Sequence, residues 1–120
     1  MRARRRKDSA HLSDAREHLR VLQQHLTRGS LDDALVRDAV SHRLEVAIDA
    51  IGKVSDELLA AEAPPEWPTI VAMRNILAHR YADLDREILQ NTIDRRLDDL
   101  VRLAAHLHAA ALAREEPASR

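Results

Sequence analysis

The residues best suited to chemistry in this 120-residue chain lie close together in the segment 73–83. Arg74 carries a planar guanidinium that stays charged and can bind a phosphate through two hydrogen bonds. His79 can exchange protons near neutral pH, and Asn75 and Tyr81 add two further polar groups. Such a set can hold a phosphodiester and move protons on and off a ribose 2′-hydroxyl without a metal ion.

The spacing of these residues limits how one helix can present them. At 100° per residue, Arg74 and Tyr81 differ by about 20°, Asn75 and His79 by about 40°, and Arg74 and His79 by about 140°. One straight helix therefore cannot aim both Arg74 and His79 at one phosphate. Either the helix unwinds at His79, or a second copy of the chain completes the site across a two-fold axis. The second alternative predicts a homodimer.

The Arg-x4-His spacing alone is not specific, because the chain contains it four times. Arg74 and His79 form the only such pair that has an Asn directly after the Arg and the sole tyrosine two residues after the His. This pair also lies near the expected end of a helix. The context, and not the spacing, singles out Arg74, Asn75, His79 and Tyr81.

Apolar residues at spacings of three and four predict the helices that position this segment. The stripes of the first two helices are Leu12, Ala15, Leu19, Leu22, Leu26 and Val40, Leu44, Ala47, Ile48, Ile51, Val54, Leu58. The third helix carries Ile70, Met73 and Leu77 and should end near Tyr81, and the last has Leu89, Ile93, Leu97, Leu100, Ala104, Leu107 and Ala111. Four helices with short connections predict an all-α, antiparallel up-and-down four-helix bundle.

Turn signals separate these stripes. Gly29 is expected to end the first helix in a left-handed conformation, and Ser30-Leu-Asp-Asp33 resembles a capping box that opens the second. The proline-rich stretch 63–68 is a connection, with Pro68 in the first turn of the third helix. Asp85 suits the N-cap of the last helix. The expected organisation is a disordered basic tail over 1–8, a helical bundle over 9–113 and a frayed end over 114–120.

Composition excludes several classes of site. The absence of cysteine rules out disulfides, cysteine-ligated zinc and a thiol nucleophile, and two glycines are too few for a glycine-rich phosphate loop. His11, His18 and His25 recur every seven residues, about 10 Å apart along a helix, which is too far for one metal ion. No metal or cofactor is expected. No apolar run is long enough to cross a membrane, so the sequence predicts a soluble, cytoplasmic protein.

The net charge of −1 hides an asymmetry. Five of the nineteen Lys and Arg residues lie in the first seven positions, which leaves fourteen basic residues against twenty acidic ones in the rest. An acidic body is not a general nucleic-acid binder, because phosphate contacts need clustered cations. The basic tail is either a solvated terminus or a segment that recruits an anionic partner.

The segment Arg74-Asn-Ile-Leu-Ala-His79-Arg-Tyr81 resembles the R-x4-H-x-Y signature of HepT-like HEPN-domain proteins, the toxins of HEPN/MNT toxin–antitoxin systems. The likeness covers roughly residues 10 to 105 and includes Asp38-Ala-Val40, Leu44-Glu45 and the Pro-Pro-x-Trp-Pro lead into the third helix. The segment 46–53 departs from the Ile-Gly-Glu-Ala pattern common in close relatives, so the resemblance assigns no site residue there.

The resemblance implies a dimeric helical bundle whose Arg–His motifs meet in a cleft, and a metal-independent ribonuclease. Arg74 and His79 would be catalytic, with Asn75 in support, and RNA, with tRNA and mRNA as candidates, would be the substrate. A cognate minimal nucleotidyltransferase antitoxin would silence the toxin by adding AMP to Tyr81, the only tyrosine in the chain.

Two other functions stay open from the sequence. The chain could be a non-catalytic AMP acceptor and binding partner of a nucleotidyltransferase, with the nuclease activity lost. Alternatively, it could be a helical dimerisation module in which Arg74 pairs with an acidic neighbour and His79 and Tyr81 cap the bundle.

Overall fold

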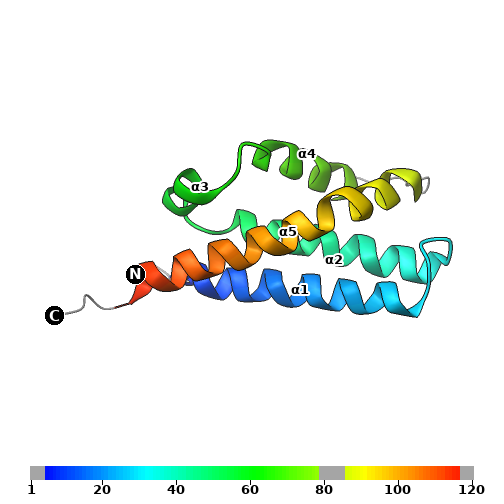
Figure 1. The fold of residues 1–120 in the computed structure, drawn as a ribbon, viewed down its shortest axis with the longest axis horizontal. Coiled ribbons are helices and arrows are strands. Elements are labelled where there is room, and N and C mark those ends of the chain that lie inside the picture. Colours follow the sequence, from blue (N-terminus) through cyan, green and yellow to red (C-terminus); the bar gives the residue numbers. More distant parts are fainter. Residues whose placement is uncertain (1–4, 79–85, 117–120) are drawn as a thin grey trace.

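The computed structural model describes residues 5–78 and 86–116 (Figure 1). Within these ranges the chain is all helical, as predicted, and contains no strand. The helices are α1 (Asp8–Arg28), α2 (Ala34–Gly52), α3 (Asp56–Glu62), α4 (Trp67–Ala78) and α5 (Arg86–Glu115). There are thus five helices in the described ranges where the sequence predicted four.

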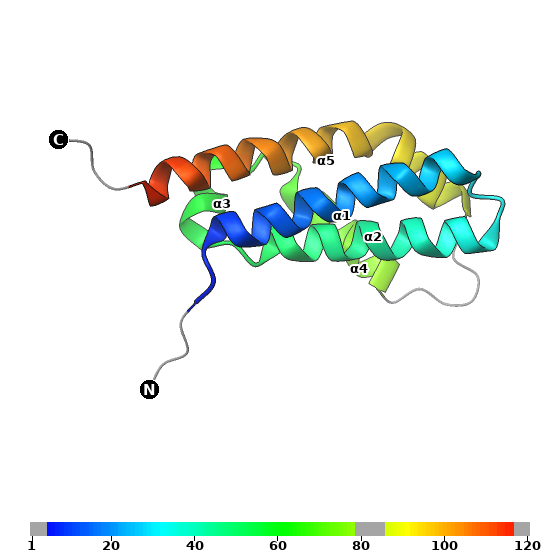
Figure 2. The ribbon, with the colours of Figure 1, turned by 90° about the horizontal axis from the view of Figure 1, so that it is seen from below.

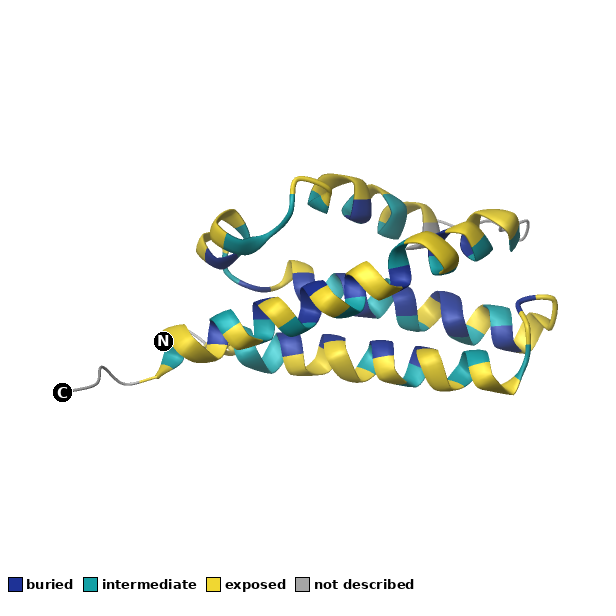
Figure 3. Ribbon diagram, in the orientation of Figure 1, coloured by how far each residue is buried: buried dark blue, intermediate teal, exposed yellow. Residues whose placement is uncertain are grey.

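The core lies between the three long helices. Helix α1 lies alongside both α2 and α5 and runs in the opposite direction to them (Figures 1 and 2). The predicted stripes of α1, α2 and α5 form this core, and only Leu26 and Ile93 among them are partly exposed. In Figure 3 the buried residues face one another across these helices, whereas α3 and α4 are mostly exposed or half-buried. The apolar spacing therefore identified the buried faces correctly.

The connection between α1 and α2 differs from the prediction in its geometry. Gly29 ends α1, but with φ of 173° its backbone is extended and not left-handed. The glycine instead permits close packing, since an added Cβ would lie 3.1 Å from Cγ2 of Val36. The predicted capping box at Ser30 is also wrong. Asp33 is the N-cap of α2, and its Oδ1 accepts a hydrogen bond from the Leu35 N–H over 2.9 Å.

The predicted second helix is divided into two. Helix α2 ends at Gly52, and Ser55 then caps α3 by accepting a 3.3 Å hydrogen bond from the Leu58 N–H. The backbone N–H and hydroxyl of Ser55 also donate to the carboxylate of Asp8, at 2.9 and 2.7 Å. Val54 and Leu58 are buried although they lie outside α2. Their burial after the turn explains why the apolar spacing seemed to continue through one helix.

Helix α4 is attached to the rest of the fold on one side only. Pro68 lies in its first turn, as predicted. Among the described helices α4 packs on α2 alone, and a groove of about 450 Å³ lies between α4 and α5. The groove is largely apolar, with Ile70 and Met73 on the α4 side and Leu97 and Leu100 on the α5 side. The predicted end of this helix near Tyr81 and the predicted N-cap at Asp85 lie outside the described residues.

The start of α1 and the end of α5 are joined by a polar contact. Ser9 donates from its N–H and its hydroxyl to the carboxylate of Glu115, at 3.1 and 2.5 Å. Helix α5 thus continues through Glu115, where the sequence predicted a frayed end, and α1 begins at Asp8. No helix in the described part of the chain is long and apolar enough to cross a membrane.

Candidate active site

Arg74 lies on α4, on the side that faces α2. Its Nη2 donates a hydrogen bond to Oδ1 of Asp49 on α2 over 2.7 Å, and its Nη1 donates to Oδ1 of Asn75 over 3.1 Å. The guanidinium is therefore held from two sides, by a carboxylate on a neighbouring helix and by the next side chain along its own helix. These two contacts hold the guanidinium in one orientation.

The Arg74 side chain is only partly buried, with 25% of its surface exposed, while Asp49 is 44% exposed. Its Nε atom is buried and has no hydrogen-bond partner among the described residues. Burying a donor without an acceptor costs free energy.

Asp49 is the functional candidate that sequence reasoning missed. The segment 46–53 was assigned no site residue, and the pair joins positions on two different helices. A weak signal was present, because Asp49 is the only charged residue in the otherwise apolar stretch 46–51. Nothing local in the sequence indicates which cation such a carboxylate meets.

The structure places two of the four predicted site residues. Arg74 and Asn75 lie together on α4, and Asn75 is exposed. His79 and Tyr81 lie outside the described residues. The assignment of Arg74, His79 and Asn75 to a catalytic site, and of Tyr81 to AMP addition, therefore stays a prediction.

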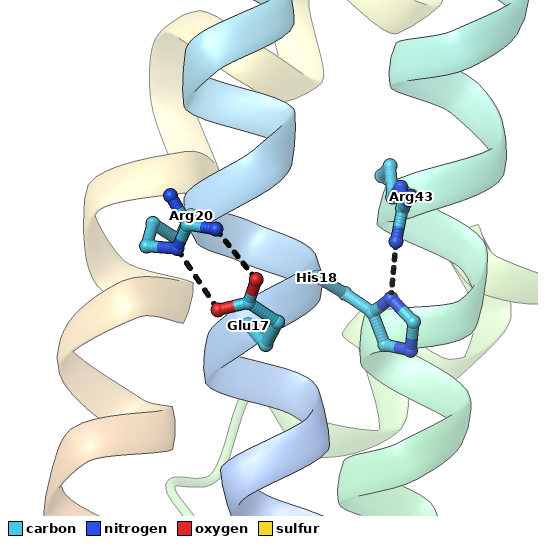
Figure 4. A network of polar contacts seen from close by, with 4 residues as sticks. All are labelled: Glu17, His18, Arg20 and Arg43. Atoms are coloured by element: carbon cyan, nitrogen blue, oxygen red, sulfur yellow. Dashed lines mark hydrogen bonds and ion pairs between the residues drawn. The ribbon is translucent and has the colours of Figure 1, made fainter.

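The histidines of α1 are half-buried. His18 accepts a hydrogen bond at Nδ1 from Nη1 of Arg43 on α2 over 2.9 Å (Figure 4). A guanidinium can only donate, so this contact requires a neutral His18 with its proton on Nε2. Burial, followed by the nearby Arg43 charge, lowers the pKa of His18. No group of three or more potential metal ligands occurs among the described residues.

Figure 4 also shows Arg20, the arginine of a second Arg-x4-His pair, whose surroundings differ from those of Arg74. Arg20 forms a two-point contact with Glu17 one turn earlier on α1, at 2.9 and 2.5 Å. The side chains of Arg20 and Glu17 are both more than half exposed. Arg20 is therefore a solvated surface residue, whereas Arg74 is half-buried and held by another helix.

Comparison with known proteins identifies one family. The family described as Ribonuclease HepT-like matches residues 12–107, a range that includes Arg74, Asn75, His79 and Tyr81 and covers most of the chain. No curated protein matches the chain. No solved structure matches it either.

Proposed function

Because the chain belongs to the HepT-like ribonuclease family, we propose that it is a metal-independent endoribonuclease with Arg74 and His79 as its catalytic residues. The observation that carries this proposal is the restraint of Arg74 by Asp49 and Asn75 inside the matched range. A half-buried guanidinium with a fixed orientation suits binding of one phosphate.

The proposed reaction uses the ribose itself as the nucleophile. The 2′-hydroxyl attacks the adjacent phosphorus and loses its proton to one His79 imidazole, while the bond to the 5′-oxygen breaks. A protonated imidazole, that of the second protomer, supplies the proton to the leaving 5′-oxygen. The products are a 2′,3′-cyclic phosphate and a 5′-hydroxyl, and Arg74 stabilises the extra negative charge on the phosphate in the transition state.

We propose that two protomers form this site, in a homodimer of helical bundles of the HEPN type. The angular separation of about 140° between Arg74 and His79 on one helix supports a site shared between two copies. The exposure of α4 is consistent with this arrangement, since α4 packs only on α2 in the described part of the fold. Ile76 on α4 is 55% exposed, which suits a residue covered by a partner.

The chain would act as the toxin of a toxin–antitoxin pair. A cognate nucleotidyltransferase antitoxin would silence it by adding AMP to the hydroxyl of Tyr81. Tyr81 lies two residues from His79 and is the only tyrosine, which supports this assignment. An AMP group there would add bulk and negative charge beside the phosphate-binding residues, and would therefore oppose RNA binding.

A structural role for the polar cluster is the second candidate function. The ion pair between Arg74 and Asp49 favours it, because a dimerisation module would also be expected to pair Arg74 with an acid. The buried Nε, for which the described residues provide no acceptor, lowers the stability that such a role would supply.

End-group analysis of RNA tests the proposal. RNA incubated with the protein in EDTA is expected to carry new 2′,3′-cyclic phosphate and 5′-hydroxyl ends. A substrate with a 2′-deoxy sugar at the cleaved position should remain intact, because the nucleophile is missing. Cleavage of the deoxy substrate would contradict the mechanism. If no RNA is cleaved but a nucleotidyltransferase adds AMP to Tyr81, the ribonuclease proposal is replaced by the non-catalytic AMP-acceptor function.

A further inference from the structure

A small pocket opens directly beside Arg74, between the end of α2 and the start of α4. Its volume is about 190 Å³. Sites that enclose a whole small ligand are usually about 300–1,000 Å³, so this pocket suits one part of a larger molecule. Its polar and aromatic lining residues are Asp49, Lys53, Trp67, Arg74 and Asn75.

Trp67 provides an aromatic surface in this pocket. It is the first residue of α4 and is half-buried at the edge of the core. Its Cζ2 atom would lie 3.9 Å from a Cβ at Gly52, so the glycine leaves space beside the indole. The chain has one tryptophan and no phenylalanine, so this indole is its largest aromatic surface. Unpaired nucleobases stack on such surfaces, and stacking of this kind does not require one base type.

Lys53 provides a second positive charge in the lining of the pocket. It is the C-cap residue of α2 and is exposed. Lys53 forms no ion pair within the part of the chain that the structure describes. Its ammonium group is therefore available to a phosphate, while Arg74 in the same pocket is already oriented by Asp49. Two cations and an aromatic surface in one pocket suit the phosphates and the base of a nucleic-acid strand.

We propose that this pocket binds one nucleotide of single-stranded RNA next to the cleaved phosphate, with its base stacked on Trp67 and its outer phosphate at Lys53. The inference rests on the proposed ribonuclease function and deepens it by naming the class of substrate. A base inside a duplex exposes only its edges, so its face cannot meet the indole. Cleavage would therefore occur in unpaired RNA.

The single tryptophan makes the pocket directly observable, because its fluorescence reports on no other site in the chain. The experiment uses full-length His79→Ala protein, so that the RNA is not cleaved, and a short single-stranded RNA labelled for anisotropy. Anisotropy reports whether the RNA binds at all, and tryptophan fluorescence reports whether it binds at this pocket. The inference predicts that the single strand quenches the tryptophan fluorescence, and that the quenching and the anisotropy saturate at the same RNA concentration. The same strand annealed to its complement should cause little quenching.

Variants separate stacking from other effects. In the His79→Ala background, Trp67→Leu is expected to weaken binding of the single strand about 5- to 150-fold, the range that one stacked base contributes, whereas Trp67→Phe keeps most of the affinity. Gly52→Leu fills the space beside the indole and should abolish quenching without changing the helical circular dichroism signal. Lys53→Gln removes the proposed contact with the outer phosphate. Its control is Arg114→Gln, which removes an equal charge at an exposed position of α5.

Each outcome is decisive. Binding by anisotropy without quenching, or equal affinity of the Trp67→Leu and Trp67→Phe variants, would overturn the pocket while leaving the ribonuclease proposal intact. The absence of any RNA binding would overturn both. Equal binding of duplex and single strand, with quenching by each, would overturn the preference for unpaired RNA.

Discussion

The Arg74 guanidinium and the Asp49 carboxylate join α4 to α2 through one hydrogen bond of 2.7 Å. This contact orients the residue proposed to bind the scissile phosphate. It also places a negative charge within reach of a negatively charged substrate, so Asp49 should weaken RNA binding while it improves the geometry for cleavage.

Replacing Asp49 should therefore separate turnover from binding. Asp49→Ala is expected to lower kcat about 10- to 100-fold, the scale of a misplaced catalytic group, without raising KM for RNA. Asp49→Asn should lower kcat by a smaller factor, because its amide oxygen can still accept a hydrogen bond from Arg74. Steady-state cleavage kinetics of both variants measure this. Asp99→Ala, which removes an exposed ion pair with Arg102, is the control, and a rise in KM with unchanged kcat would contradict a positioning role.

Replacing Arg74 itself should affect activity far more than stability. Arg74→Met has similar length but lacks polar atoms, so it removes the unsatisfied Nε and leaves Asp49 solvated. We expect cleavage to be lost and the free energy of unfolding to fall by no more than about 1 kcal/mol, or to rise. Urea denaturation measures the stability, and Arg74→Lys is the control that keeps the charge. A clear loss of stability in the methionine variant would favour the dimerisation-module function.

The contact between His18 and Arg43 predicts how stability depends on pH. Protonation of His18 would break this hydrogen bond and place two cations together. Its pKa is lowered by burial, then by Arg43, with His42 acting in the same direction, while Asp14 and Glu17 oppose the shift. Because the folded pKa lies below the unfolded value of about 6.5, this contribution to stability is complete above that pH and is lost as the pH falls through the folded pKa.

Chemical denaturation between about pH 5 and 7 measures this effect. His18→Gln can still accept from Arg43 but does not titrate, so it should flatten the dependence. Arg20→Gln is the matched control, since it removes the exposed contact with Glu17 on the same helix and should leave the slope in this range unchanged. An equal slope in wild type and His18→Gln would assign the dependence to other groups, of which His11, with its own lowered pKa, is the first to test.

The carboxylate of Asp8 should contribute to stability through Ser55. It accepts two hydrogen bonds from that residue and so ties the start of α1 to the start of α3. Asp8→Ala is expected to reduce the free energy of unfolding by about 1–3 kcal/mol, because the Ser55 donors lose a charged acceptor. Asp98→Ala on the exposed face of α5 is the control. Equal stability of the two variants would show that water replaces Asp8 fully.

The sequence predicted what depends on local spacing. The buried stripes of α1 and α5 follow from apolar residues three and four apart, and the match of the 74–81 segment to a known signature identified the family. The apolar spacing did not predict the end of α2. Val54 and Leu58 are buried by a turn and a new helix, in positions that also fit one continuous helix. The spacing also gave Asp49 no role, because the partner of that carboxylate is set by the packing of α4 on α2.

Cleavage of tRNA and total RNA in EDTA by wild type, beside His79→Ala, tests the central claim most directly. We expect the wild type to cleave RNA without a metal ion, and His79→Ala to be inactive while its circular dichroism spectrum and its mass in solution match those of the wild type. Undiminished cleavage by a folded His79→Ala protein would contradict the proposed site, and loss of wild-type cleavage in EDTA would contradict its independence of metal.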